Sequence, residues 1–386
     1  MNQTPDGRWS EFRSLVPATR KWAYLDNAAV APLSSAARDA IRRWSTAACD
    51  EGDTAWSDWA QGVETVRKLA ATLIQAAPEE IAFVANTTAG ITLVAEGLPW
   101  QVGDNVVVLG NEFPSNLYPW MNLAARGVEC RRIAAPGVVV EVDRILAACD
   151  QRTRLISASW VGYASGWRLD IDALAQAAHR RGILVLVDAI QALGVFPLNV
   201  HKTPIDFLAA DGHKWLMGPE GAGLFYIRRE HLERLRPLGV GWNSVVHAHD
   251  FARIDLNLRP TAARYEGGSQ NMCGVLALGA SLKMLAQFGL GPDQSPLAQR
   301  VLEITDLACD RLASLGAVIH SQRTENERSG IVAFDLPGRD LQHEKRRCLE
   351  AGIVLSLRNG WLRISPHAYA NDQDIARLAE VLQQPG

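Results

Sequence analysis

The chain has 386 residues, of which 48% are hydrophobic and 21% are charged, and its formal net charge is -3. A chain of this length can bury a large core and is long enough for more than one domain. The small net charge offers neither a basic stripe for nucleic acid nor a basic amphipathic segment for a membrane surface. We therefore expect a small polar partner, with no nucleic acid and no membrane.

The amino-terminal stretch has no basic segment followed by an apolar one, and no run of about 18 apolar residues occurs in the sequence. These features predict a cytoplasmic protein. The cysteines are scattered without a C-x-x-C pair, which is typical of reduced thiols in an intracellular protein. They are Cys49, Cys130, Cys149, Cys273, Cys309 and Cys348.

In chain order, short apolar runs alternate with stretches of helical periodicity, a pattern typical of a mostly parallel sheet covered by helices. The expected strands cover residues 81–84, 105–109, 155–158, 184–188, 207–210 and 223–227. Helices are expected between them, at residues 89–98, 120–125 and 171–181.

After about residue 275 the pattern changes, which indicates a second and smaller α+β domain. A long helical stretch is followed by a strand at 330–335, a helix at 342–351, a strand at 361–365 and a final helix. We predict an amino-terminal segment at 1–25 that packs with the small domain, a large cofactor-binding domain at 26–275, and the small domain at 276–386.

The most informative stretch runs from residue 205 to residue 227, where Lys214 follows an apolar strand and precedes a glycine-rich return into the next strand. A sheltered lysine is costly unless its charge is removed or matched. A Schiff base with an aldehyde cofactor is one use of such an amine. For Lys214 alone, a surface lysine in a loop is the simpler interpretation.

Two further segments place polar groups at strand ends. Asp188 ends an apolar strand, at the edge where ligand-binding groups gather in open α/β sheets. There, a carboxylate can keep the pyridine nitrogen of pyridoxal 5′-phosphate (PLP) protonated, although a helix cap is the alternative. Residues 83–91 supply hydroxyl and N–H groups at a helix start, which can bind a phosphate or simply cap the helix.

Together these segments resemble the class V aminotransferase group of the fold-type I PLP enzymes, which includes cysteine desulfurases, selenocysteine lyases and isopenicillin N epimerase. The resemblance extends from residues 24–29 (YLDNAA) to residues 362–369 (LRISPHAY). It implies an α/β fold in which the large domain has a mostly parallel seven-stranded sheet and the C-terminal domain is a smaller α+β unit.

The resemblance also implies roles around the cofactor ring. Lys214 corresponds to the Schiff-base lysine that moves the proton at Cα, and Asp188 to the partner of the pyridinium. Gln191 corresponds to the hydrogen-bond partner of the phenolic oxygen. Phe113 stands where desulfurases carry a histidine that stacks on the ring, and an aromatic face can stack there without shuttling a proton.

At the phosphate end, the resemblance assigns the binding groups to Thr88, the Ala89 backbone and His213. Ser269 matches a residue that reaches the phosphate of the neighbouring subunit, so the resemblance implies a homodimer with active sites at the subunit interface. Asp211 departs from the small residue usual in the group. Because a carboxylate repels phosphate, we expect Asp211 to point elsewhere or to be paired.

At the substrate end, Arg363 matches the arginine that clamps the α-carboxylate, a task suited to a planar cationic fork. Asn27 and Ala28 fall in the segment that lies beside the substrate. Desulfurases of the group carry a persulfide-forming cysteine on a loop shortly before that arginine. No cysteine follows Cys348 here, so we expect neither this relay nor a sulfur-acceptor scaffold.

Aromatic and histidine residues give weaker signals. Some tryptophans near the site segments could line an aromatic substrate pocket or could pack in the core. They are Trp160, Trp167, Trp215, Trp242 and Trp361. The histidines at 247 and 249 lack further ligands at suitable spacing, and we expect no metal site.

Three reactions at Cα or Cβ remain open. The sequence pattern favours a β-lyase for a carbon–sulfur or carbon–selenium bond, and an epimerase or racemase and an aminotransferase are the alternatives. The absence of a G-x-G-x-x-G fingerprint disfavours a nicotinamide oxidoreductase. A non-catalytic protein is disfavoured because Lys214, Asp188 and Arg363 are all present.

Overall fold

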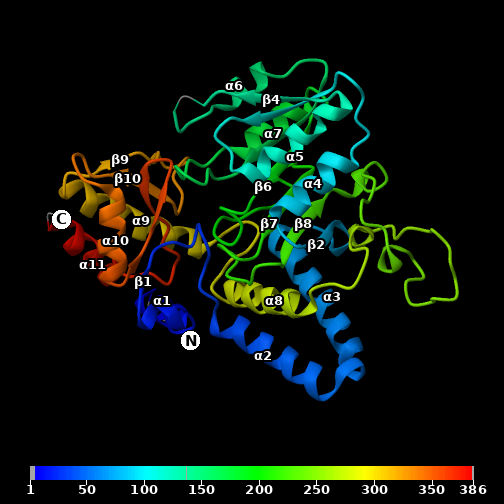
Figure 1. Cartoon of the computed structure of the whole chain (residues 1–386), viewed down its shortest axis with the longest axis horizontal. Coiled ribbons are helices and arrows are strands. Elements are labelled where there is room, and N and C mark those ends of the chain that lie inside the picture. The colour runs from blue at the N-terminus through cyan, green and yellow to red at the C-terminus, as the bar shows by residue number, and fades with distance from the viewer. Residues whose placement is uncertain (1–4, 136, 385–386) are drawn as a thin grey trace.

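The computed structural model describes residues 5–135 and 137–384. A seven-stranded sheet with the order β2-β8-β7-β6-β5-β3-β4 forms its centre (Figure 1). Only β8 runs antiparallel to its neighbours, so the expected mostly parallel sheet is confirmed. In chain order the strands are β2 (Ile81–Val84), β3 (Asn105–Leu109), β4 (Glu129–Ile133), β5 (Thr153–Ser159), β6 (Leu184–Asp188), β7 (Phe207–Asp211) and β8 (Gly223–Ile227).

Both faces of this sheet are buried, because side chains alternate between two hydrophobic clusters. Val106 and Val108 belong to one cluster, whereas Val107 and Leu109 belong to the other. The first cluster includes buried residues of α4 (Thr87–Gly97) and α5 (Tyr118–Asn122). The second includes residues of α3 (Trp56–Ile74), α6 (Val142–Ala147), α7 (Ile171–His179) and α8 (Met272–Gln287).

The C-terminal part builds a separate antiparallel sheet with the order β12-β13-β10-β9. Its strands are β9 (Val318–Ile319), β10 (Val332–Asp335), β12 (Ser356–Arg358) and β13 (Trp361–Ile364). Helices of this part are α9 (Pro296–Ser314), α10 (Leu341–Glu350) and α11 (Asp372–Gln383). A third hydrophobic cluster lies between this sheet and these helices.

The amino-terminal segment packs against the C-terminal part. Strand β1 (Ala23–Tyr24) pairs in parallel with β11 (Ile353–Val354). Arg13, on helix α1 (Pro5–Ser14), makes a 2.6 Å ion pair with Asp374 on α11. The expected boundary at residue 275 falls inside α8, which packs on α3 and on α2 (Ser35–Asp50). The division into domains stays a prediction.

Several elements differ from the sequence prediction, although all six expected strands of the large sheet are present. Strand β4 was not predicted because it lies at the sheet edge, where its residues are mostly partly exposed and charged. Helices α2 and α3 were also not predicted. Only two alanines of α2 are buried, so no run of large apolar residues marks this helix in the sequence. Within the described residues, we find no helix with the length and apolarity needed to span a membrane.

Candidate active site

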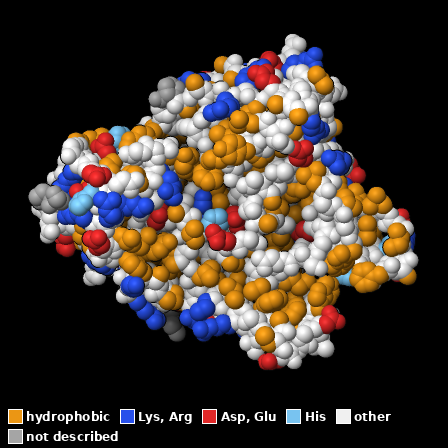
Figure 2. Space-filling view, viewed as in Figure 1, with side chains coloured by type: hydrophobic (Ala, Val, Ile, Leu, Met, Phe, Trp, Pro, Cys, Tyr) orange, Lys and Arg blue, Asp and Glu red, His pale blue; other side chains and the backbone are white. Residues whose placement is uncertain are grey.

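A cavity of about 290 Å³ opens at the carboxyl ends of the central strands. Figure 2 shows acidic, basic and histidine side chains gathered near the centre of this face of the molecule. The cavity is lined by Ala28, Ala29, Val30, Asn86, Thr87, Thr88, Phe113, Ser115, Ser159, Tyr163, Asp188, Ile190, Gln191, Asp211, His213, Lys214, Arg358 and Arg363.

The parallel strands explain why these polar groups meet. Ser159, Asp188 and Asp211 are the last residues of β5, β6 and β7, and all three line the cavity. Parallel neighbours end at the same edge of a sheet, where a side chain can leave the apolar core and face a ligand. Lys214 follows β7 by a few residues and faces the same space.

Lys214 and Asp188 are both buried, and burial shifts their pKa values toward one another. Burial lowers the pKa of Lys214 to about 8, against the opposing effect of Asp188. Burial raises the pKa of Asp188 to about 6, although an N–H bond from Ile190 at 3.1 Å and the charge of Lys214 oppose it. The cavity therefore holds an amine that can lose its proton near neutral pH and a carboxylate without a closely matched cation.

The start of helix α4 forms one end of the cavity. The Thr88 hydroxyl donates to Ser115 Oγ at 2.8 Å, and both residues line the wall. The first N–H groups of a helix lack intrahelical acceptors and favour an anion. The Ala89 N–H donates to the side chain of Asn86 at 2.8 Å and Ala89 does not line the cavity, so its phosphate role stays a prediction.

Asp211 and His213 lie beside this helix start. The Asp211 carboxylate accepts the Gly212 N–H at 2.7 Å, and His213 Nδ1 lies 2.9 Å from its other oxygen. Asp211 is therefore paired, as one of the two expected arrangements requires. It does not point elsewhere, since its side chain still lines the cavity.

Arg363 forms the opposite wall and is held by three hydrogen bonds. It donates to Asp26 Oδ1 at 3.0 Å, to Ser356 Oγ at 3.1 Å and to the Tyr163 carbonyl at 2.6 Å. Burial lowers the pKa of Arg363, and the carboxylate of Asp26 opposes this change. These contacts fix a planar cation in the wall, ready to bind a carboxylate.

The segment after β1 forms a third wall. Gln191 donates from Nε2 to the Ala28 carbonyl at 3.0 Å and accepts from Trp215 Nε1 at 2.9 Å. Ala28 and Gln191 line the cavity, whereas Asn27 is fully buried outside its lining. The Tyr369 hydroxyl donates to Asn27, and Asn27 Nδ2 has no hydrogen-bond partner among the described residues.

A tight hairpin carries Arg358 and Arg363. Arg358 pairs with Trp361 across β12 and β13, so only Asn359 and Gly360 form the turn. Their φ angles are 51° and 84°, as a type I′ turn requires. The Tyr163 hydroxyl, from the cavity wall, donates to Asn359 Oδ1 at 3.1 Å and holds the turn in place.

Ser269 does not lie in this cavity. It is exposed and lines a separate hollow of about 420 Å³ together with Trp44, Trp56, Trp59 and Trp242. The cavity lies at the ends of the central strands. Ser269 follows none of these strands, because it lies in a connecting segment just before α8.

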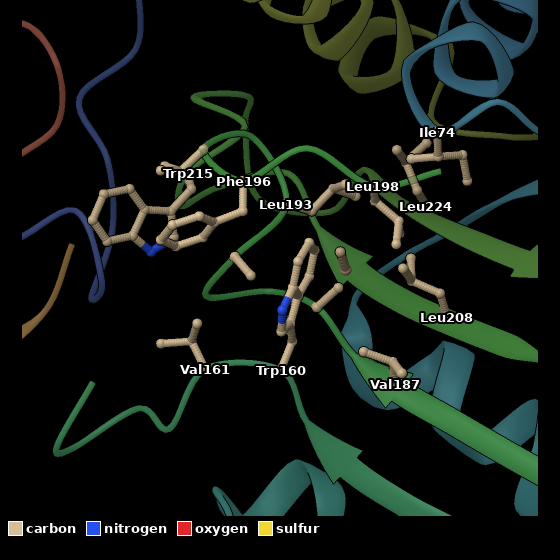
Figure 3. Close-up of a cluster of buried hydrophobic side chains, with 14 of the residues drawn as sticks. Ile74, Trp160, Val161, Val187, Leu193, Phe196, Leu198, Leu208, Trp215 and Leu224 are labelled. Atoms are coloured by element: carbon tan, nitrogen blue, oxygen red, sulfur yellow. The ribbon is translucent and has the colours of Figure 1, made fainter. Parts of the chain in front are cut away.

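Of the five tryptophans singled out, Trp160, Trp167 and Trp215 pack in the core, whereas Trp242 is exposed and lines the separate hollow. None of the five tryptophans singled out lines the cavity. Trp160 and Trp215 are buried in the same cluster as Phe196 (Figure 3). Trp167 belongs to that cluster as well, and Trp361 stacks on His320 with 4.5 Å between ring centroids.

Sequence reasoning missed several polar residues of the site. Ser159 was recognisable, because it ends a strand as Asp188 does. Ser115, Tyr163 and Arg358 carried no local signal, since loops and the distant hairpin bring them to the cavity. Glu112 is buried just outside the lining, where it accepts from the Ser159 N–H at 2.7 Å. Burial raises its pKa to about 7.

Comparison with known proteins identifies the family of this chain. The family model described as "Aminotransferase class-V" matches residues 23–377. The chain belongs to the class V aminotransferase family. A "Probable cysteine desulfurase" of Methanothermobacter thermautotrophicus is 29% identical over 98% of both chains. A "Cysteine desulfurase" of Klebsiella pneumoniae is 33% identical over 81% of this chain and 77% of its own.

Among solved structures, this class V chain resembles a complex of the cystine C–S lyase C-DES with its product cysteine persulfide. The TM-score is 0.88 and the identity 23%, over 96% of this chain and 100% of the other. This likeness supports the fold-type I fold.

The class V chain is a PLP-dependent enzyme. Its cavity fits that cofactor. Lys214 offers an amine with a lowered pKa, and Asp188 is a buried carboxylate that a pyridinium would match. The start of α4, with Thr88, suits a phosphate.

Proposed function

We propose that the chain is a β-lyase that cleaves a carbon–sulfur or carbon–selenium bond of an amino acid and releases the sulfur or selenium group directly. The observation that carries this proposal is the presence of Lys214 and Asp188 on a cavity whose lining contains no cysteine. The relatives named as cysteine desulfurases support the same class of bond.

Lys214 and Asp188 would divide the work at the reacting atoms. Lys214 would hold the aldehyde carbon of PLP until an amino acid replaces it, and its freed amine would then remove the Cα proton. A pKa of about 8 suits this role near neutral pH. Asp188 would keep the pyridine nitrogen protonated. When bound, PLP would supply an acceptor for the electron pair left at Cα, the chemistry that would let a substituent at Cβ leave with its bonding electrons.

Other residues would hold the cofactor in place. Thr88 and His213, beside the start of α4, would bind the phosphate. Gln191 would donate to the phenolic oxygen, because its Nε2 carries a second hydrogen besides the one given to Ala28. Phe113 would stack on the ring, and its centroid already lies 5.6 Å from Lys214 Nζ.

Arg363 would clamp the α-carboxylate of the substrate. A guanidinium has five N–H groups, and three are engaged with Asp26, Ser356 and Tyr163. One N–H remains on each terminal nitrogen, which is the arrangement for a two-pronged carboxylate contact. We infer that Asn27 and Ala28 support this substrate side of the cavity.

A protein persulfide is not part of the proposal. Cys348, the last cysteine of the sequence, is buried on α10, and burial raises its pKa to about 12. The thiolate is the form that attacks sulfur, so this side chain is a poor acceptor. We therefore also propose that no sulfur-acceptor scaffold is needed.

We infer a homodimer whose active sites lie at the subunit interface. The exposed position of Ser269, outside the cavity of its own chain, supports a role at the phosphate of the neighbouring subunit. A location in the cytoplasm remains a prediction from the sequence.

Product analysis of the holoenzyme tests the proposed reaction. Cysteine, cystine and selenocysteine are supplied in turn, and sulfide, selenide or pyruvate is the expected product. Exchange of the Cα hydrogen without net loss would instead indicate an epimerase or racemase. A keto acid formed with the amine form of the cofactor would indicate an aminotransferase.

Two variants sharpen this test. Lys214→Ala should abolish both turnover and the visible absorbance of the lysine-bound cofactor. Cys348→Ala should keep turnover, and mass spectrometry during turnover should find no persulfide on the chain. A cysteine that carries a persulfide and is required for activity would overturn direct release.

A further inference from the structure

Two arginines lie side by side on the hairpin at the cavity. Ser356 on β12 pairs directly with Arg363 on β13, and Arg358 lies two residues beyond Ser356. Side chains of directly paired residues, and of residues two apart on one strand, lie on the same face. Arg358 and Arg363 therefore project from one face of the hairpin, and both line the cavity.

The two guanidinium groups differ in what balances their charge. Arg363 is buried and bonds Asp26 at 3.0 Å, so a carboxylate of the chain already matches it. Arg358 is half-buried and donates from Nη1 to the Leu357 carbonyl at 2.9 Å. Among the described residues, no carboxylate lies within ion-pair distance of Arg358.

Arg358 also faces other charged groups, and its charge acts on the Asp26 carboxylate that Arg363 already bonds. Burial is the main cause of the lowered pKa of Lys214, and the charges of Arg363 and Arg358 lower it further. A cation beside like charges and without a carboxylate partner favours binding of an anion. Because the hairpin is fixed by the Tyr163 to Asn359 hydrogen bond, Arg358 is held at the cavity wall.

We propose, on the basis of the proposed function, that the substrate is an amino acid whose side chain carries a second acid group, and that Arg358 binds this group. Arg363 takes the α-carboxylate, and Arg358 takes the side-chain acid from the diagonal position of the same hairpin. The cavity then selects a dianionic amino acid over a neutral one. Arg358 is the specificity-determining residue.

Binding of simple acids to the holoenzyme tests this assignment without turnover. Glutarate and butyrate have similar length but differ by one carboxylate, and neither has an amine that reacts with the cofactor. Titration calorimetry should give glutarate an affinity at least about tenfold higher than that of butyrate, as an added charge-assisted hydrogen bond implies.

Three variants define the outcome. Arg358→Gln should weaken glutarate about tenfold more than it weakens butyrate, and Arg358→Lys, which keeps the charge, should restore part of the preference. Arg363→Gln should weaken both acids. Equal losses for the two acids in Arg358→Gln, or an unchanged ratio, would overturn the proposal.

The failure of this inference can be distinguished from failure of the proposed lyase. If the lyase proposal fails, the products of the amino-acid panel change, while the glutarate to butyrate ratio still reports on Arg358. If only the specificity proposal fails, sulfide or selenide still forms, and a neutral amino acid such as cysteine is used as well as one with an acidic side chain.

Discussion

Two buried aspartates at opposite ends of the central strands have opposite electrostatic environments. Asp188 ends β6 and is 3% exposed, whereas Asp206 precedes β7 and is 1% exposed. The pKa of Asp188 is raised to about 6, and that of Asp206 is lowered to about 2. The two aspartates are similarly buried, so burial alone does not decide which of them is ionised. Their hydrogen-bond partners decide it.

The partners of Asp206 are all protein groups. One oxygen lies 2.8 Å from His179 Nε2 and accepts the Val185 N–H at 2.7 Å, and the other lies 2.7 Å from His231 Nε2. Burial opposes ionisation, but these hydrogen bonds outweigh it. Asp206, Glu230 and His231 also have ligand-type atoms within 4.8 Å of one another, although Asp206 and His231 are already bonded to each other.

Asp188 lacks such partners. This difference distinguishes a residue of a binding site from a residue of a structural cluster such as Asp206 with its two histidines. Its carboxylate accepts one N–H bond from Ile190. Asp188 lines the cavity, where, under the proposed function, the pyridinium of the cofactor would supply the missing cation. The chain thus completes one aspartate by itself and leaves the other to be completed by a ligand.

The largest expected effect is on turnover in Asp188→Asn. An amide cannot keep the pyridine nitrogen protonated, so the developing charge at Cα loses its main stabilisation, and kcat should fall on the order of 10³-fold. Steady-state kinetics at saturating PLP measures this. Asp206→Asn is the matched control and should keep its turnover per folded molecule. An equal loss of kcat in Asp206→Asn would contradict the distinction between the two ends of the central strands.

The pH dependence of apoenzyme stability should separate the same two residues. The folded pKa of Asp188 is above its usual 3.8, so its contribution to stability is present at low pH and is lost as the pH rises through about 6. The expected loss is about 3 kcal/mol. Urea unfolding between about pH 4 and pH 7 should show a larger loss in the parent apoenzyme than in Asp188→Asn, and Glu112, whose pKa burial raises to about 7, contributes to the loss in both. An identical profile in the variant would contradict the raised pKa.

Asp206 should show the opposite sign and a slightly smaller effect. Its folded pKa of about 2 lies below the usual 3.8, so its stabilisation is present above 3.8 and is lost as the pH falls through about 2. Asp206→Asn should lower the free energy of unfolding near neutral pH by about 2 kcal/mol. Asp39→Asn, at an exposed partner of Arg38, should change it far less, because solvent screens that pair. Equal changes in the free energy of unfolding in Asp206→Asn and Asp39→Asn would contradict a stabilising role for the buried hydrogen bonds of Asp206.

The smallest expected effect concerns the phosphate end of the site. Thr88→Val keeps the shape of the side chain but removes the hydroxyl at the start of α4. The dissociation constant of PLP should rise about tenfold, the value expected for one hydrogen bond to a charged group. Equilibrium dialysis of the apoenzyme measures this change. Thr92→Val, on the same helix outside the cavity, should have no comparable effect.

The sequence predicted the parts of the site that depend on local pattern. Lys214 and Asp188 follow apolar strands, and the edge of a parallel sheet necessarily brings such residues together. The six central strands were predicted for the same reason, because their apolar runs are continuous. Arg363 was assigned through the family resemblance rather than from its own surroundings.

What the sequence could not predict depends on contacts between distant segments. Arg358 reaches the cavity only because the C-terminal hairpin lies against the large domain at Tyr163, and no local pattern encodes that contact. Similarly, the resemblance assigned the Ala89 backbone to the phosphate, whereas its N–H donates to Asn86 in this structure. Its use by Asn86 depends on side-chain geometry at the cap. Strand β4 was not predicted because an edge strand needs little apolar surface.

The turn at Asn359 and Gly360 has a consequence for protein engineering. A two-residue connection is the shortest in common use for a hairpin, so its length can change only by growth. Both arginines belong to the paired strands, so an insertion after Asn359 that keeps its hydrogen bond with Tyr163 would lengthen the turn and leave both strand positions unchanged. The hairpin is therefore a ready attachment point for a grafted lid or for an added nucleophile.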